Sequence, residues 1–232
     1  ITSLQQKKYR KQEQLFFAEG VKVVQELLNS NFELQDLFTT KQDFLTVSKD
    51  KVHAISEAEL KKISALTTPN TCLAVFKMPK SKDFVEKGLI VALDDVRDPG
   101  NLGTIIRLCD WFGIETLFCS EESVDIYNPK VVQATMGSIS RVNVVYGNLE
   151  AFLTKTKLPV FGTFMDGKNI YQEKLPKEGI IIMGNEANGI SSSVEKLVSE
   201  RIAIPRFGNL QVTESLNVAT ATAIILSEFK RS

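Results

Sequence analysis

The stretch "LIVALDDVRDPGNLGTIIR" (residues 89–107) decides the fold of this chain. Its first part, 89–95, is a near-continuous apolar run, which is typical of a strand buried on both faces of a sheet. The turn "DPGNLG" (98–103) follows, and a helical pattern begins there. That helix would bury one apolar stripe, formed by Ile105, Leu108, Cys109 and Phe112. The stretch therefore predicts a central strand, a tight turn and an amphipathic helix.

Further strands and helices alternate after this stretch. Short apolar segments recur as "TLFCS" (116–120), "VNVVY" (142–146), "PVFGTF" (159–164), "GIIIMG" (179–184) and "RIAI" (201–204). Such alternation predicts an α/β domain over 89–232, with a mostly parallel sheet and helices on both faces. The last helix, roughly Glu214 to Phe229, is rich in alanine and threonine, which favours close packing on another helix or a second chain.

The first third of the chain predicts a smaller α/β unit, 1–77. A helix is expected over 19–30, and strands over 34–40, 51–55 and 71–77. Ser56 and Glu59 have the spacing of a capping box, so a second helix should begin there. The segment 78–88 is polar and lysine-rich, which is typical of a linker.

Composition narrows the class of protein. The 232 residues are 43% hydrophobic and 24% charged, as in a globular protein of one large or two small domains. No apolar run is long enough to span a membrane, and no signal-peptide pattern opens the chain. The three cysteines lie in apolar contexts, so we expect buried free thiols and a cytoplasmic protein. A single histidine, His53, argues against a histidine-rich metal site or a Ser/His/Asp triad, and no metal is expected.

Charge gives a weaker signal. The net charge is zero, so a globally basic RNA-binding surface is not indicated. The densest basic cluster, "KKYRK" (7–11), has two interpretations: a solvated terminal arm, which charge alone favours, or a contact for a polyanion.

Three glycine-bearing loops follow predicted strands, and ligands of open α/β sheets bind at the carboxyl ends of strands. The first is the turn at 97–107, which matches neither G-x-G-x-x-G nor the P-loop. Arg107 points away from the apolar stripe, alongside Gly103 and Trp111. Taken alone, it is most simply a surface arginine paired with Asp110.

The other two loops are "GNEANG" (184–189) and "IPRFGNLQVTESLN" (204–217). Glu186 between two glycines is costly unless it contacts something, and open backbone at both glycines suits a flat ligand, although the loop could be a mere turn. Thr213 or Ser215 could cap the last helix. Asn217 would then lie in an otherwise apolar, packed helix, which is unusual.

Together these segments resemble the SpoU (TrmH-type) group of RNA ribose 2′-O-methyltransferases, in the SPOUT superfamily. The matching positions are Asn101, Gly103, Arg107, Gly184, Glu186, Gly189, Ile204, Pro205, Gly208, Ser215, Leu216 and Asn217, with the segment 127–142 between the first two motifs. The unit ending at Lys77 is similar to the small ribosomal-protein-like RNA-binding domain of many members. One departure is the link 206–214, which is about three residues longer than the family pattern.

The resemblance implies a deep trefoil knot, S-adenosylmethionine as cofactor and a homodimer joined through the C-terminal domain. It implies that the cofactor is bound by Gly184, Asn185, Gly189, Ile204 and Leu216, and that Arg107, Asn101, Glu186, Ser215 and Asn217 serve catalysis. The substrate would be RNA, ribosomal rather than transfer RNA. The resemblance also makes Arg107 a candidate for the base. Because a free arginine side chain stays protonated at any pH below about 12, we expect Arg107 to orient the ribose and stabilise negative charge.

Two other classes compete with this interpretation. A dehydrogenase is disfavoured because the Rossmann fingerprint and its acidic residue are missing. A non-catalytic RNA-binding assembly factor is compatible with the bipartite layout, but the presence of Arg107 and Asn217 favours an enzyme.

Overall fold

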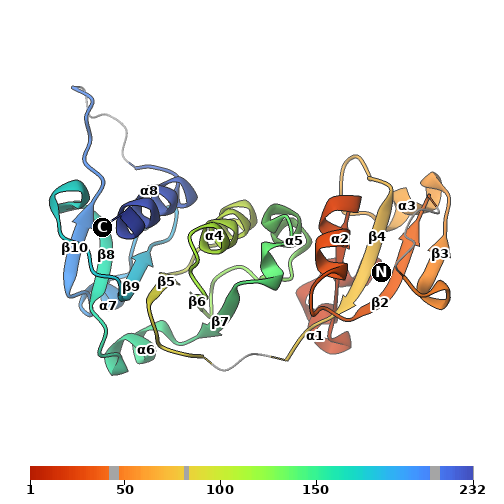
Figure 1. The fold of residues 1–232 in the computed structure, drawn as a ribbon, viewed down its shortest axis with the longest axis horizontal. Helices are drawn as coiled ribbons and strands as arrows, with labels where there is room; N and C mark the ends of the chain where they lie inside the picture. Colours follow the sequence, from red (N-terminus) through yellow and green to blue (C-terminus); the bar gives the residue numbers. More distant parts are fainter. Residues whose placement is uncertain (42–46, 81–83, 210–214, 232) are drawn as a thin grey trace. The chain divides into compact units, whose positions relative to one another are not determined.

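The computed structural model describes residues 1–41, 47–80, 84–209 and 215–231 (Figure 1). Contacts divide the chain into two compact units. The first comprises Ile1–Ser81 and Asp125–Ser140, and the second comprises Lys82–Val124 and Arg141–Ser232. The segment 125–140 thus groups with the first unit, although it lies within the stretch that the sequence assigns to the second domain. The boundaries 1–77, 78–88 and 89–232 stay a prediction.

The first unit is built on a four-stranded sheet with the order β1-β4-β2-β3. Its strands are β1 (Leu15–Glu19), β2 (Leu34–Thr39), β3 (Val52–Ala54) and β4 (Cys72–Lys77). β4 pairs antiparallel with β1 and β2, and β3 pairs parallel with β2. The helical elements are η1 (Thr2–Gln5), α1 (Lys7–Glu13), α2 (Val21–Leu28), η2 (Lys49–Lys51), α3 (Glu57–Ile63), α5 (Pro129–Thr135) and η3 (Ser138–Ser140). The capping box of Ser56 and Glu59 at the start of α3 is confirmed.

The basic cluster at 7–11 is not a solvated arm. It lies in α1, and its Arg10 is only 2% exposed. The Arg10 guanidinium donates to the carbonyls of Leu4 and Gln5 and forms a 2.6 Å ion pair with Asp125. Arg10 therefore ties the segment that begins at Asp125 to the N-terminal helices, while the lysines of the cluster remain exposed.

The second unit contains a six-stranded sheet with the order β10-β8-β9-β5-β6-β7, in which every pairing is parallel. Its strands are β5 (Leu89–Leu93), β6 (Thr116–Ser120), β7 (Asn143–Gly147), β8 (Val160–Asn169), β9 (Gly179–Met183) and β10 (Glu200–Ala203). All residues of β5, β6 and β9 are buried, because these strands have layers of side chains on both faces. The predicted central strand and parallel sheet are confirmed.

Helices cover both faces of this sheet (Figure 1). They are α4 (Pro99–Trp111), α6 (Leu149–Lys155), η4 (Ile170–Gln172), α7 (Ser192–Glu195) and α8 (Val218–Arg231). Successive strand residues point to opposite faces. Val160 packs in a cluster with α6 and α7, whereas the next residue, Phe161, meets Phe229 of α8 with ring centroids 5.2 Å apart. Helix α8 packs in turn against α4, which carries Asn101, Gly103 and Arg107 of the predicted motifs.

The three cysteines are free and buried, as the sequence predicts. Burial raises the pKa of the Cys72 thiol to about 12 and also raises the pKa of Cys109 and Cys119. At neutral pH these thiols are protonated and serve packing rather than chemistry. Within the described ranges, no helix combines the length and apolar character that crossing a bilayer requires.

Candidate functional site at the carboxyl edge of the parallel sheet

The first site loop joins β5 to α4. Asp98 is the N-cap of α4, and its carboxylate accepts a 2.8 Å hydrogen bond from the backbone N–H of Asn101. Pro99 occupies the first turn, where a missing N–H costs nothing. The acid-proline pair therefore fixes where the helix begins and places Asn101 on its first turn.

The second loop, 184–189, closes on itself. The backbone N–H and C=O of Asn185 both bond to Gly189, each at 2.9 Å. A Cβ at Gly184 would lie 2.3 Å from the carbonyl carbon of Gly189, and Gly189 has a φ of 68°. Both glycines are thus required by the loop's own geometry. On the side of Gly184 where a Cβ would lie, the backbone of Gly189 and Ile190 fills the space. The interpretation that Gly184 leaves room for a flat ligand is therefore wrong for that side.

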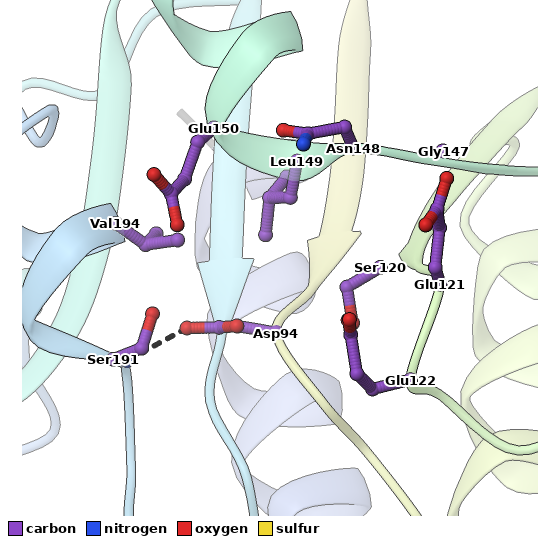
Figure 2. A pocket seen from close by; sticks show the side chains of 10 residues that line it. All are labelled: Asp94, Ser120, Glu121, Glu122, Gly147, Asn148, Leu149, Glu150, Ser191 and Val194. Carbon is purple, nitrogen blue, oxygen red and sulfur yellow. Dashed lines mark hydrogen bonds between the residues drawn. The ribbon is translucent and has the colours of Figure 1, made fainter.

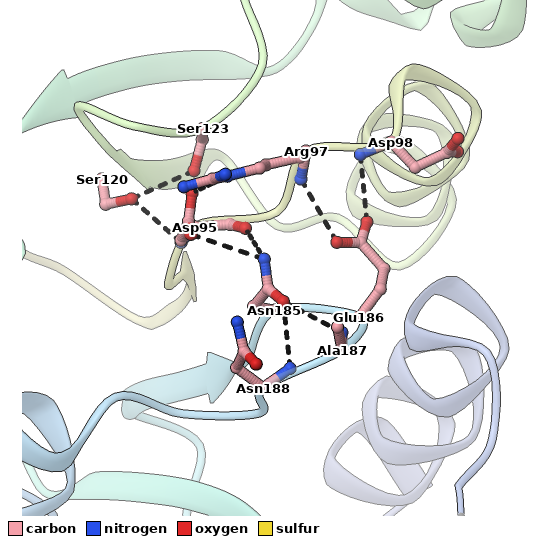
Figure 3. Close-up of polar contacts among 9 residues, drawn as sticks. All are labelled: Asp95, Arg97, Asp98, Ser120, Ser123, Asn185, Glu186, Ala187 and Asn188. Atoms are coloured by element: carbon pink, nitrogen blue, oxygen red, sulfur yellow. Dashed lines mark hydrogen bonds and ion pairs between the residues drawn. The ribbon is translucent and has the colours of Figure 1, made fainter.

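Glu186 joins the two loops (Figure 3). Its carboxylate accepts hydrogen bonds from the backbone N–H groups of Arg97 (3.3 Å) and Asp98 (3.1 Å) and from the side-chain amide of Asn101 (3.0 Å). The expectation that Glu186 must contact something is confirmed. A negative charge beside the first turn of α4 also suits the positive end of the helix dipole.

The pKa of Glu186 lies below its ordinary value. Partial burial, the largest single influence, raises the pKa, but the hydrogen bonds from Asn101 and from the backbone amides of Glu186, Asp98 and Arg97 together outweigh it. Glu186 is therefore an anion at neutral pH, and it acts as an acceptor that holds Asn101.

Asn217 connects the third loop to the first. Its side-chain oxygen accepts from the backbone N–H groups of Ala219 (2.9 Å) and Thr220 (3.1 Å), while its amide donates to the Asn101 oxygen at 2.8 Å. Asn217 is therefore the cap of α8, and the predictions of a helix from Glu214 and of a cap at Ser215 are wrong. Asn217 is not buried inside the helix, because α8 begins at Val218. Thr213 lies outside the described residues.

Arg107 is exposed on α4, and it forms no hydrogen bond or ion pair among the described residues. Asp110, its expected partner, instead forms a 2.8 Å ion pair with Arg141. Gly103, one turn earlier, is buried rather than solvent-facing, since α8 packs against α4. The simple explanation of Arg107 as half of an i, i+3 surface pair is therefore wrong.

The remaining predicted site residues lie along the loops and, within the described part of the chain, are not hydrogen-bonded to Asn101, Glu186 or Asn217. The side chain of Asn185 is fully engaged in contacts within the protein. Its amide donates to the Asp95 carbonyl at 2.6 Å, and its oxygen accepts from the backbone N–H groups of Ala187 and Asn188. Ser215 and Gly208 are exposed, and Ile204 is half-buried. Leu216 is 49% exposed, which is high for a leucine. The structure thus connects Asn101, Glu186 and Asn217 directly, whereas it shows no bond from Arg107 or Ser215 to these three.

A polar hollow of about 90 Å³ lies beyond the ends of β5, β6 and β7 (Figure 2). It is lined by Asp94, Ser120, Glu121, Glu122, Gly147, Asn148, Leu149, Glu150, Ser191 and Val194. Asp94 is buried and accepts a 2.7 Å hydrogen bond from the backbone N–H of Ser191. Pockets for small molecules span about 300–1,000 Å³. The hollow is therefore too small for a nucleoside cofactor, and its acidic lining disfavours a phosphate.

These features define an α/β protein with a candidate ligand site at the carboxyl edge of a parallel sheet, where three loops are linked through Asn101, Glu186 and Asn217. Residues 88–227 match the model of the SpoU rRNA Methylase family, and the chain belongs to this family. Residues 1–74 match the MRM3-like substrate binding domain.

Known relatives cover almost the whole chain. A TrmH-family protein of Porphyromonas gingivalis is 41% identical, with a TM-score of 0.89 over 99% of this chain and 95% of that one. The AdoMet-bound rRNA methyltransferase of Sinorhizobium meliloti is 29% identical, with a TM-score of 0.87 over 99% and 92%. The 23S rRNA (guanosine(2553)-2′-O)-methyltransferase of Bacillus subtilis is 29% identical over 230 residues, 96% of this chain and 91% of the relative.

Proposed function

We infer that this protein transfers a methyl group from S-adenosylmethionine to a ribose 2′-hydroxyl of ribosomal RNA. The observation that carries the inference is the hydrogen-bonded series Glu186–Asn101–Asn217, which joins one residue from each of the three site motifs. Family membership and the activities named for the Bacillus and Sinorhizobium relatives support the same reaction.

We propose that S-adenosylmethionine is held by the loops 184–189 and 204–217. The donors would be backbone groups near Gly184, Asn185, Gly189 and Ile204, with Leu216 against the adenine. Two observations fit this group: Leu216 presents an apolar side chain at 49% exposure, and the Cβ side of Gly189 faces open space. When bound, the cofactor supplies an electrophilic methyl on a sulfonium, and the protein supplies position and charge.

Leu216→Arg tests this placement. The longer, charged side chain should fill the adenine position and weaken S-adenosylmethionine binding at least about tenfold, which corresponds to roughly 1.4 kcal/mol. Isothermal calorimetry measures the affinity directly, and Val85→Arg, at another exposed apolar residue of the same unit, is the matched control. Unchanged affinity in Leu216→Arg would refute the pocket assignment.

The chain's own residues have distinct roles in this proposal. Arg107 orients the target ribose and its phosphate and stabilises the negative charge that develops on the 2′ oxygen, because a guanidinium donates strong, charge-assisted hydrogen bonds. A guanidinium is a poor general base, so the proposed role is orientation and charge stabilisation. Glu186 holds Asn101, Asn217 spans α4 and α8, and Ser215 contacts substrate or cofactor beside them.

We further propose that the protein acts as a homodimer through its C-terminal domain. Trp111, the last residue of α4, is 84% exposed, and α4 packs against α8. Aromatic side chains are enriched in surfaces that a second chain covers, which supports this proposal. We propose a cytoplasmic location for this dimer, in keeping with a ribosomal RNA substrate.

We also propose the trefoil knot of the family for the C-terminal chain. Strand β10 lies at the sheet edge beside β8, whereas the following helix α8 packs against α4. We propose that, between these two elements, residues 204–217 pass through the loop after β9, as the knot of the family requires. A crystal structure in which residues 204–231 pass outside that loop would contradict the knot.

Methyl incorporation tests the function. Purified protein should transfer tritiated methyl from S-adenosylmethionine to ribosomal RNA from a strain that lacks it. Labelling of transfer RNA in place of ribosomal RNA would reassign the substrate, and labelling of neither would favour a non-catalytic assembly factor.

A further inference from the structure

Asp95, two residues after the end of β5, has an unusual backbone conformation, and its N–H, C=O and carboxylate all form polar contacts (Figure 3). Its φ is 59°, in the left-handed region that residues other than glycine, asparagine and aspartate rarely adopt. Its N–H donates to the Ser120 hydroxyl (3.0 Å), and its C=O accepts from the Asn185 amide (2.6 Å). Its carboxylate pairs with Arg97 (2.7 Å) and accepts a longer hydrogen bond from the same Asn185 amide (3.4 Å). Asp95 is thus the junction of the end of β6, the loop after β9 and the start of the turn into α4.

The backbone contacts of Asp95 fix its conformation more firmly than the ion pair of its carboxylate with Arg97 does. Arg97 is 69% exposed, and ion pairs in contact with water contribute little to stability. Ser120, by contrast, is buried, and its hydroxyl also bonds to Ser123, so the acceptor of the Asp95 N–H is fixed in place. Asn185 is fixed as well, because its side-chain oxygen caps its own loop.

Asp95, with its left-handed backbone, turns the chain just before the two backbone N–H groups that bind Glu186. The backbone N–H groups of Arg97 and Asp98 point at the Glu186 carboxylate, and that carboxylate holds Asn101. An alternative backbone at Asp95 would turn these two amides away and release Glu186. Strained backbone of this kind is often found where it positions a functional group.

We propose that Asp95 is a positioning residue for methyl transfer, and that its left-handed backbone, rather than its carboxylate, directs the turn that holds Glu186 and Asn101. The proposal rests on the proposed roles of Glu186 and Asn101 in the reaction. It assigns a function to a residue outside the predicted site set, which acts through the turn into α4 and through its bond to Asn185.

A matched pair of variants distinguishes the effect of the Asp95 backbone conformation from the effect of its carboxylate. Asp95→Gly and Asp95→Ala both remove the carboxylate, but only glycine adopts a positive φ without cost. We expect Asp95→Ala to lower kcat about tenfold, because a left-handed alanine is disfavoured, and Asp95→Gly to stay within about threefold of wild type. Asp95→Asn, which tolerates this conformation, should resemble glycine, and KM for RNA should be unchanged in all three. Asp166→Ala, which removes an exposed carboxylate paired with Arg201, is the control.

A second readout does not need activity. In ¹³C NMR titrations of the Glu186 carboxylate, the pKa should stay below its ordinary value in wild type and Asp95→Gly and rise toward it in Asp95→Ala. Equal kcat losses in the glycine and alanine variants, or an alanine variant with wild-type kcat and Glu186 titration, would overturn the proposal. If the wild-type protein methylates no ribosomal RNA, the proposed function fails, and the NMR titration still decides the role of Asp95.

Discussion

Arg107 and Glu186 are the two charged residues on which the proposed chemistry depends, and their surroundings differ. Glu186 accepts hydrogen bonds from three protein groups, so it is already oriented without substrate. Arg107 is exposed and unbonded among the described residues, so its guanidinium is available to a phosphate or a developing oxyanion. Glu186 therefore organises the loops, and we propose that Arg107 acts on RNA.

The lowered pKa of Glu186 gives a pH dependence with a definite sign. A carboxylate whose folded pKa lies below its unfolded value of about 4.5 stabilises the fold fully above that value. The stabilisation is lost as pH falls from there through the lowered folded pKa. Thermal unfolding should therefore show wild type more stable than Glu186→Gln at neutral pH, with a difference that shrinks below pH of about 4.5.

The control for this prediction is Glu178→Gln, at an exposed position of the same unit. Its difference from wild type should be small across the same pH series. A Glu186→Gln difference that grows on acidification would contradict the hydrogen-bonded anion.

Single residues also mark the limit of sequence-based prediction. That Glu186 needs partners follows from its place between two glycines, and the structure confirms it. The burial of Arg10 could not be foreseen, because its partner Asp125 is 115 positions away and charged residues are rarely buried. The role of Asp95 was missed for a related reason: its φ depends on contacts with Ser120 and Asn185 that only the folded chain brings together.

At the scale of elements, the apolar runs predicted the strands of the second unit well, because a parallel strand with helices on both faces must be apolar throughout. Helix ends were harder to predict. The third loop contains Thr213, Ser215 and Asn217, all of which can cap a helix. Packing of α8 on α4 and the bond to Asn101 select Asn217, and neither can be inferred from local sequence.

Asn217 has two functions that substitutions can separate. Asn217→Asp keeps the oxygen that caps α8 but loses the amide that donates to Asn101, whereas Asn217→Ala loses both. We expect the aspartate variant to retain wild-type stability and lose methylation. The alanine variant should lose methylation and about 1 kcal/mol of stability, the usual cost of a lost cap.

Urea denaturation and methyl incorporation, measured on the same preparations, test this separation. Wild-type methylation in Asn217→Asp would show that the bond to Asn101 is dispensable and that Asn217 serves only as a cap.

At the scale of the molecule, the exposed Trp111 makes the proposed dimer testable. Trp111→Glu places a charge on the surface that a second copy would cover, and burying an unpaired charge is strongly unfavourable. We expect wild type to behave as a dimer in light scattering and Trp111→Glu to dissociate toward monomer. Lys196→Glu, an exposed change on another surface of the same unit, should leave the dimer intact. A monomeric wild type would contradict the proposal.

The most direct test of the account maps 2′-O-methyl groups in ribosomal RNA from a strain that lacks this protein. Wild-type protein should restore methylation at a defined ribose, and Arg107→Ala should restore none while binding S-adenosylmethionine with near wild-type affinity. No missing methyl group in the deletion strain, or full restoration by Arg107→Ala, would contradict the central claim that this chain methylates ribosomal RNA through Arg107.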